Sequence, residues 1–461
     1  MSAHHSALPI AVIGAGFSGT MAAIQLLDSL PHNRPVLLCE RSASFGRGLA
    51  YGTGDFGHFL NLRASNMSAY PDRPRHFEQW LARNALDLPP DEAAGVRVTP
   101  GGTFASRALY GRYLSEILTD TVTGSGPPRL RLVNDGISDL VPRPGGFALR
   151  TEGGLSLPVA GAVLAMGNLA GTGEPHSRHR ADLWSPETIG RLQPELPVLI
   201  VGTGLTMIDA VISLRRRGFG GPIIALSRRG LLPNTHAPTE ALPVPNLTGV
   251  DLRSLTALTR RIRAAAHAAG DDWRNVIDAL RPITDYVWRS LPASERERFL
   301  RHLRPFWDVH RHRSAPPAAA AIADDIAAGC LTVRAGRILS IEDEPSRAVV
   351  TLRPRGAAEP ERLTVQCILD ATGIGRVSKT PDPLLRRLID RGLVRPGPFG
   401  LGLDVDADFR ARGLPLGGPL WTIGPLMRGA LWECIAVPDI RNQAADLAAG
   451  IAAELARDEA A

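Results

Sequence analysis

The stretch Pro9-Ile10-Ala11-Val12-Ile13-Gly14-Ala15-Gly16-Phe17-Ser18-Gly19, followed by a mostly apolar run from Thr20 to Leu30, decides the fold prediction. A short apolar strand enters three glycines spaced G-x-G-x-x-G, and a helical pattern comes next. Gly14 permits the tight turn, Gly16 lets the backbone approach a pyrophosphate, and Gly19 lets the helix pack on the strand. An ordinary glycine-rich turn is the alternative, so the prediction depends on the residues downstream of the helix.

A second apolar strand, Pro35 to Cys39, follows the helix and ends at Glu40. Glu40 lies 40 − 14 = 26 residues after Gly14, where this fold places a carboxylate that binds ribose hydroxyls. Strand, turn, helix and acid agree. We therefore predict an adenine-dinucleotide site that accepts a free ribose diol, as in FAD.

The composition argues against several classes of protein. The 461 residues carry 52 basic and 46 acidic side chains, a net charge of +6, and Lys379 is the only lysine. Because the arginines are spread along the chain, we do not expect a nucleic-acid partner. No charged leader with a signal-like apolar core precedes the first strand, and no apolar run reaches membrane-spanning length. We expect a soluble, cytoplasmic protein without a membrane partner.

The same plan begins again at Leu196, where an apolar strand enters Gly202-Thr203-Gly204 and a helix. Its second strand, Pro222 to Leu226, is followed by Arg228 and Arg229. Guanidinium groups at this place suit the 2′-phosphate of NADPH, whereas an acid would favour NADH. A solvated surface turn is the alternative reading of the two arginines.

One residue of the second turn departs from the pattern. Met207 occupies the position of Gly19, and its side chain should push the helix away from the strand. The pyridine nucleotide would then bind loosely or transiently.

Each turn is followed by short alternating strands and by a closing apolar strand that ends in glycine. The closing strands are Pro158 to Ala165 before Gly167, and Leu363 to Leu369 before Gly373. We predict an α/β fold with two Rossmann-like dinucleotide-binding domains, each with a β-meander, plus a helical insertion. The FAD-binding domain should comprise residues 1–190 and 374–461, and the NAD(P)H-binding domain residues 191–373 with the insertion at about 251–328.

One FAD and one NADPH in a single chain imply hydride transfer to flavin. The four cysteines form no C-x-x-C, which argues against dithiol reductases and against a zinc site. Three readings remain: a monooxygenase that uses molecular oxygen, a flavin-dependent dehydrogenase or reductase, and a non-catalytic flavin-binding protein.

The helical insertion contains the densest group of basic and aromatic side chains. We expect no metal site at His302, His310 and His312, because H-x-H on a helix points the two rings apart. An anion pocket for a planar ring is one reading of this segment, and helix packing with solvated arginines is the other. The predicted substrate-binding residues are Arg304, Trp307, His310, Arg311 and Arg313.

The motifs together resemble those of a known family. GAGFSG, FLNLRASNMSAYPDRPRHFEQWL, FASRALYGRYL, GTGLTMIDAVISL, SRRGLLP, FLRHLRPFWDVHRHR and IGPLMRGALWECIAVPDIRNQA are similar to the motifs of the bacterial FAD/NAD(P)-binding protein family. This family is related to the class B, N-hydroxylating and Baeyer–Villiger flavin monooxygenases. Ser106 and Ile374 depart from it, since proline is common at both positions.

The resemblance implies a monooxygenase that uses FAD, NADPH (or NADH) and oxygen on a small planar anionic metabolite. Urate, the substrate of an FAD-dependent urate hydroxylase of purine degradation, is the leading candidate. The residues carry no prediction of a catalytic side chain or of the oligomeric state. The predicted cofactor-binding residues are Gly14, Gly16, Phe17, Ser18, Gly19, Glu40, Arg41, Asn61, Met67, Gly167, Gly202, Gly204, Leu205, Thr206, Arg228, Arg229, Gly373 and Gly424.

Overall fold

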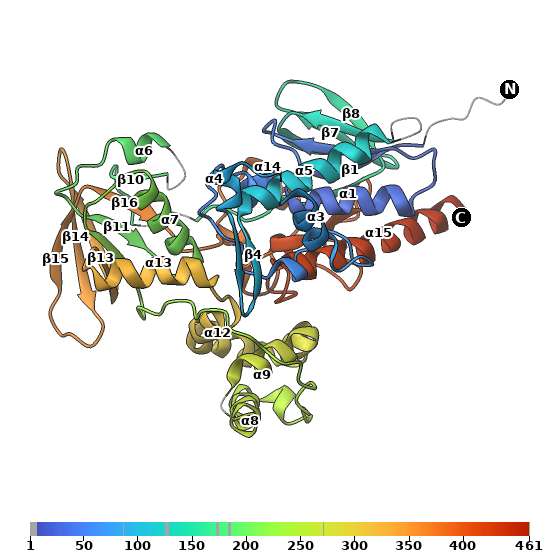
Figure 1. Ribbon diagram of the computed structural model, residues 1–461. Helices are drawn as coiled ribbons and strands as arrows, with labels where there is room; N and C mark the ends of the chain where they lie inside the picture. Colours follow the sequence, from blue (N-terminus) through green and yellow to red (C-terminus); the bar gives the residue numbers. More distant parts are fainter. Residues whose placement is uncertain are drawn as a thin grey trace.

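Two sheets with parallel strands at their centres organise the protein (Figure 1). The structure is a computed structural model that describes residues 7–85, 87–124, 129–171, 175–182, 186–270 and 272–460. Within these ranges, the predicted α/β fold with two Rossmann-like domains and a helical insertion is confirmed.

The first sheet has five parallel strands in the order β17-β9-β1-β2-β5. β1 and β9 are wholly buried, as expected for strands whose two faces are covered by other elements. Helix α1 packs against the C-terminal helix α15. The bounds are β1 (Ile10–Ile13), α1 (Phe17–Ser29), β2 (Val36–Glu40), β5 (Leu130–Asn134), β9 (Gly161–Leu164), β17 (Leu420–Thr422) and α15 (Val437–Ala460).

The second sheet has seven strands in the order β10-β16-β11-β12-β13-β14-β15. The first five are parallel, and the last two continue the sheet as antiparallel strands. Helices α7 (Leu205–Arg216) and α13 (Pro316–Ala327) pack on each other beside it. The strands are β10 (Arg180–Ala181), β11 (Val198–Val201), β12 (Ile223–Ser227), β13 (Leu331–Asp343), β14 (Ala348–Pro354), β15 (Glu361–Val365) and β16 (Cys367–Asp370).

Each of the two predicted closing strands is in fact two strands, so the prediction of a single strand is wrong in both domains. The run from Pro158 to Ala165 divides at Ala160 into β8 (Ser156–Val159), which pairs with the meander strand β7 (Gly146–Thr151), and β9, which pairs with β1. The run from Leu363 to Leu369 divides at Gln366 in the same way. A continuous apolar run does not reveal that the chain leaves one partner strand and pairs with another.

After the insertion, the second domain continues with one long strand. β13 spans 13 residues, because its first part pairs with β12 and its second part pairs with β14. In the first domain the meander β6 (Ile137–Arg143), β7 and β8 is instead a separate sheet.

The motif FASRALYGRYL, which begins at Phe104, is divided between a strand and a helix. Phe104 and Ala105 belong to β4 (Gly102–Ala105), which pairs with β3 (Val96–Thr99), and α5 spans Arg107–Thr123. Ser106 is the N-cap of α5, and its hydroxyl accepts the Leu109 N–H at 3.2 Å. The side chain at this departure from the family pattern therefore caps a helix. Shorter helices of this domain are α2 (Gly48–Tyr51), α3 (His76–Asn84) and α4 (Pro90–Ala93).

The insertion between β12 and α13 stands away from both sheets (Figure 1). Its helices are α8 (Leu255–Ala268), α9 (Trp273–Leu280), α10 (Thr284–Ser290), α11 (Ala293–Arg298) and α12 (Arg304–Arg311). The π-helical turn η4 (Phe299–Leu303) precedes α12. α13, inside the predicted insertion range, packs on α7 of the second domain.

The chain returns to the first domain after β16. α14 (Pro383–Asp390) packs on β6, and Arg391 forms an ion pair with Asp139 at 2.6 Å. The segment that leaves the first domain and the segment that returns to it lie side by side, because the Gly375 N–H donates to the Leu169 carbonyl at 2.9 Å. A Cβ on Gly375 would lie 2.1 Å from the Ala170 carbonyl oxygen. The two connections therefore form one paired link.

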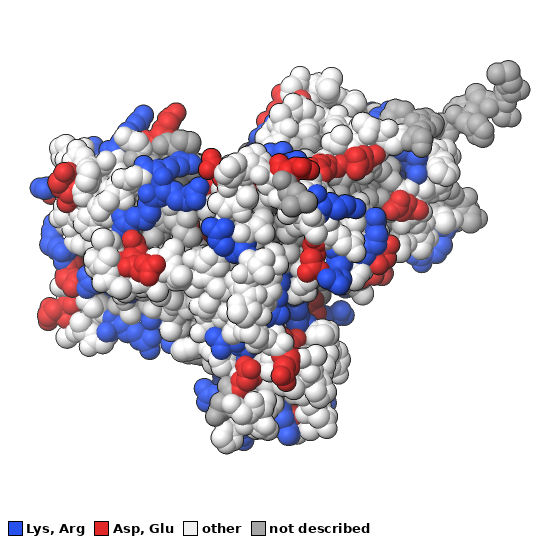
Figure 2. Space-filling model, viewed as in Figure 1, with Lys and Arg blue, Asp and Glu red and all other residues white. Residues whose placement is uncertain are grey.

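Charged side chains of both signs are distributed over the face in Figure 2. Basic side chains are densest over α7 and α6 (Pro186–Gly190) of the second domain, where Arg215 and Arg216 end α7. Within the described ranges, none of the helices combines the length and apolar character needed to cross a membrane.

Candidate functional site

The first glycine turn has room only for glycine at two of its positions. Gly14 has φ +101°, and a Cβ there would lie 2.5 Å from the Ala165 carbonyl oxygen. A Cβ on Gly19 would lie 1.8 Å from the Gly14 carbonyl oxygen. α1 begins at Phe17 after Gly16, which has no side-chain cap. The first N–H groups of α1 therefore remain available to a phosphate.

Glu40 lies beside this turn. Its Oε2 accepts the Ala15 N–H at 2.9 Å, and its Oε1 accepts the Ser42 N–H at 3.1 Å. The carboxylate is thus held at the end of β2, the position predicted for a ribose ligand. Arg41 points elsewhere: its guanidinium pairs with Glu152 at 3.2 Å and is mostly exposed.

Gly424 brings the C-terminal part of the chain to the same turn. It has φ +76°, and a Cβ there would lie 2.5 Å from the Ser18 hydroxyl. The short helix η7 (Gly424–Met427) begins at this contact. Gly167, with φ +67°, follows β9 at the same edge of the sheet.

The remaining predicted first-domain residues have other surroundings. The Phe17 ring lies 6.4 Å from Tyr51 and 6.2 Å from Tyr110. Met67 is 2% exposed within the first core. Asn61 uses its backbone carbonyl to accept a hydrogen bond from His236 Nε2 at 2.8 Å.

The second turn repeats the strained glycine. Gly202 has φ +119°, and a Cβ there would lie 2.1 Å from the Ala371 carbonyl oxygen. Around Gly204 the space is open, since a Cβ there would meet no described atom within 4 Å. α7 begins at Leu205 and Thr206, as α1 does at the matching positions. Gly373 follows β16 with φ +91°.

Met207 is fully buried in the core of the second domain. At the matching position Gly19 has no room for a Cβ, so α7 cannot approach its turn as closely as α1 does. The first backbone bond of α7, from Ile208 to Gly204, is 3.3 Å, whereas the matching bond of α1, from Thr20 to Gly16, is 2.9 Å. The second turn is therefore slightly more open than the first.

The two arginines after β12 differ in their contacts. Arg229 donates to the His302 carbonyl at 3.3 Å, and its guanidinium lies 4.8 Å from the centre of the Phe306 ring. Arg228 is exposed and has no hydrogen-bond or ion-pair partner among the described residues. Only Arg228 is thus unengaged and available to a 2′-phosphate.

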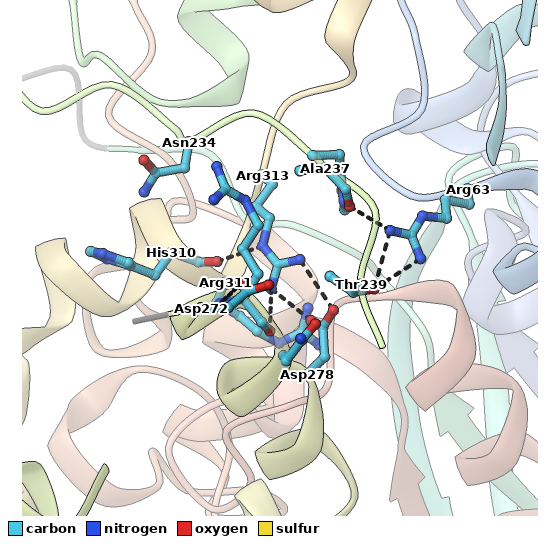
Figure 3. Close-up of polar contacts among 12 residues, drawn as sticks. Arg63, Asn234, Ala237, Thr239, Asp272, Asp278, His310, Arg311 and Arg313 are labelled. Atoms are coloured by element: carbon cyan, nitrogen blue, oxygen red, sulfur yellow. Dashed lines mark hydrogen bonds and ion pairs between the residues drawn. The ribbon is translucent and has the colours of Figure 1, made fainter. Parts of the chain in front are cut away.

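The predicted substrate cluster is largely engaged within the protein. Arg313 pairs with Asp278 at 2.6 Å and donates to the His310 carbonyl at 2.9 Å (Figure 3). Arg311 pairs with Glu433 at 3.0 Å, and Arg304 pairs with Asp308 at 3.2 Å. The His310 ring lies edge-on at 4.5 Å from the Trp273 ring, whereas Trp307 Nε1 is buried without a hydrogen-bond partner among the described residues.

A strap of residues 234–239, which was not predicted from the sequence, links the two domains and the insertion. Arg63 of the first domain donates to the Ala237 carbonyl at 2.8 Å and to Thr239 at 3.2 Å (Figure 3). His236 bonds to Asn61, and burial lowers the pKa of its imidazole to about 4. Arg63 and Asn61 lie in the motif FLNLRAS, which was the only signal for this contact.

The first glycine turn has an acid, Glu40, at the position that binds ribose hydroxyls, and the second has an arginine, Arg228, without a partner among the described residues. These features are typical of a protein with two dinucleotide-binding domains. Residues 11–169 match the FAD-NAD(P)-binding family, which confirms the family resemblance predicted from the sequence. An uncharacterized protein of Mycobacterium tuberculosis is 24% identical over 524 aligned residues, covering 97% of this chain and 95% of the relative.

Solved structures share the whole fold. L-lysine 6-monooxygenase from Pseudomonas syringae superposes with a TM-score of 0.62 at 19% identity, covering 98% of this chain and 99% of the other. An ornithine N-hydroxylase from Kutzneria sp. 744, solved with reduced FAD, NADP⁺ and L-ornithine, has a TM-score of 0.61 at 15% identity, with 98% and 99% covered. The chain therefore shares its fold with these two monooxygenases.

Proposed function

We propose that this protein is an FAD-dependent monooxygenase that uses NAD(P)H and molecular oxygen on a small-molecule substrate. The observation that carries the proposal is the pair of glycine turns, one beside Glu40 and one beside Arg228, in a chain with the complete fold of such enzymes. The turns could also serve a dehydrogenase or a non-catalytic flavoprotein, so the reaction with oxygen has to be measured.

The residues fit the two cofactors. The first turn would hold the FAD pyrophosphate against the N–H groups of α1, and Glu40 would accept the ribose hydroxyls. The second turn would hold NAD(P)H, with Arg228 at the 2′-phosphate. When bound, reduced FAD supplies the chemistry that activates oxygen. The chain itself would bind and orient the two nucleotides.

The four cysteines support this choice over a thiol–disulfide reductase. All four are free, and three of them (Cys39, Cys367 and Cys434) are buried. Burial raises the pKa of the Cys39 thiol to about 12, which keeps it a poor nucleophile.

The substrate prediction, urate, stays a prediction. The two enzymes with a similar fold act on L-lysine and L-ornithine. A panel of test substrates should therefore contain primary amines as well as urate. Oxygen uptake, NADPH oxidation, peroxide release and the mass of the product should be measured together with each compound.

We expect one compound to stimulate NADPH oxidation and to gain one oxygen atom. Stimulated oxidation that yields only hydrogen peroxide would contradict a monooxygenase acting on that compound. Reduction of the flavin by NADPH with electrons passing to a quinone rather than to oxygen would favour the dehydrogenase, and no reduction would favour the non-catalytic flavoprotein.

A further inference from the structure

Arg428 is a largely buried arginine to which the described residues offer no counter-ion. The residue is 6% exposed, yet its guanidinium makes no hydrogen bond and no ion pair with any described residue. Its guanidinium contacts the Trp432 ring, whose centre lies 5.7 Å away. None of the three guanidinium nitrogens is among the buried polar atoms that lack a hydrogen-bond partner, so each of them reaches solvent. The described residues therefore supply no counter-charge to a guanidinium that an anion from solvent could reach.

The segment that carries Arg428 is firmly held. Asp285 of α10 accepts the N–H groups of Trp432 and Glu433 at 2.7 and 2.9 Å. Trp288 Nε1, also in α10, donates to the Gly429 carbonyl at 2.9 Å. Because both neighbouring parts of the backbone are fixed, the backbone position of Arg428 is well defined.

The charges that face Arg428 do not neutralise it. The ionisable groups that interact electrostatically with Arg428 include Arg304, Asp308, Arg376, His312 and Cys434. Arg304 and Asp308 already pair with each other. Burial lowers the pKa of His312 to about 3 and raises the pKa of the Cys434 thiol, so both are neutral at pH 7. Burial also lowers the pKa of Arg428, to about 10, which still leaves it charged.

The position of Arg428 connects it to the first nucleotide turn. It directly follows η7, whose first residue Gly424 contacts Ser18 at that turn. With a rise of about 2 Å per residue, the four residues of η7 place Arg428 about 8 Å along the helix from the turn. Arg304 and Asp308 of α12 interact electrostatically with Arg428, and they share one face of that helix with Trp307, whose buried Nε1 also has no hydrogen-bond partner among the described residues.

We propose that Arg428 binds the anionic group of the substrate, a carboxylate on a small organic acid, at the contact between η7 and α12. This inference rests on the proposed function and names the substrate class for it. A carboxylate would receive two N–H groups from the guanidinium and supply the missing counter-charge. The unpaired Trp307 N–H offers a further donor on the facing helix.

The thermal midpoint of the FAD-loaded protein tests this without turnover. The probes are pairs that differ by one carboxylate or its charge: L-lysine and cadaverine, benzoate and benzamide, acetate and acetamide, all at one ionic strength. A ligand that binds only the folded state raises the midpoint. We expect at least one carboxylate to raise it by several degrees while its partner compound does not, and we expect Arg428→Gln to lose this shift.

The control is Arg263→Gln, since Arg263 is exposed on α8 and has no hydrogen-bond or ion-pair partner in the described part of the chain. It should keep the carboxylate shift. Without any probe, Arg428→Gln should melt at the same or a higher temperature than the wild type, because an unpaired buried charge is removed. A lower midpoint would mean that Arg428 is structural and would overturn the proposal.

Two further outcomes would also overturn it. One is that no carboxylate stabilises the wild type. The other is that Arg428→Gln loses the shift caused by NADP⁺ rather than that caused by the carboxylate, which would assign Arg428 to the nucleotide. Reduction of the flavin by NADPH is measured separately: its absence would contradict the proposed function while the carboxylate result stands.

Discussion

Arg311 of the helical insertion and Glu433 of the C-terminal segment form a bidentate ion pair with both side chains 5% exposed. Nε lies 3.2 Å from Oε1, and Nη2 lies 3.0 Å from Oε2. The pair joins segments 122 positions apart in the sequence. Arg311, predicted as a substrate ligand, thus fastens the insertion to the first domain.

Arg311→Met should destabilise the protein strongly, because Glu433 would remain buried and unpaired. The expected loss is about 3–5 kcal/mol in the free energy of unfolding. Denaturant unfolding of the wild type, Arg311→Met and the double variant Arg311→Met/Glu433→Gln measures it. The double variant should recover much of the loss, and equal instability of both variants would contradict the ion-pair explanation.

The same variant should depend on pH in a defined direction. Burial already raises the pKa of Glu433, and Arg311 lowers it. Without Arg311 the folded-state pKa rises further, so the unpaired acid becomes neutral more easily as the pH falls. The stability deficit of Arg311→Met relative to the wild type should therefore shrink on acidification.

Glu40→Ala should weaken the retention of FAD by about 1–3 kcal/mol, because the ribose hydroxyls and the Ala15 N–H lose their acceptor. Equilibrium dialysis with FAD measures the change, and extraction should yield FAD rather than FMN. Glu152→Ala is the control, because Glu152 pairs with Arg41 away from the turn. Unchanged FAD binding in Glu40→Ala would refute the assignment of this turn.

Arg228→Ala should raise the KM for NADPH by about 10-fold or more while leaving that for NADH nearly unchanged, since a charge-assisted bond to the 2′-phosphate is lost. Arg229→Ala is the matched comparison. It should affect the two nucleotides equally, because Arg229 contacts His302 and Phe306 of the insertion. An equal loss of both nucleotides in Arg228→Ala would make that arginine structural.

Acidification from about pH 7 to about pH 5 should destabilise the protein through His236. Burial lowers its folded-state pKa to about 4, whereas the unfolded side chain titrates near its ordinary value of 6.5. Between these values the unfolded state binds the additional proton, so stability falls as the pH falls. His236→Gln should flatten the pH dependence of the unfolding midpoint. An unaltered slope would show that other groups set it.

The glycine spacing predicted the fold well, because φ values of +101° at Gly14 and +119° at Gly202 exclude nearly all other residues. Such a constraint acts within a few neighbouring residues and is visible in the sequence. The end of β2 at Glu40 follows from the same local geometry.

The substrate cluster could not be read in this way. Arg311 and Arg313 look alike in a dense run of arginines, but their carboxylate partners are Glu433 and Asp278, distant in the sequence. Arg428, the buried arginine left without a partner among the described residues, lies in another motif altogether. Whether an arginine finds a counter-ion depends on which distant segments the fold brings together. The periodicity of the sequence contains no information about those contacts.

The paired link at Leu169 and Gly375 has a mechanical consequence. Since the second domain leaves and re-enters the first at a single point, two backbones side by side resist torsion that one flexible connection would permit. Together with the strap of residues 234–239 and the Arg311–Glu433 ion pair, this link limits rotation of the second domain relative to the first. The same arrangement makes the second domain and its helices one removable cassette, whose deletion would need only a short bridge to reseal the first domain.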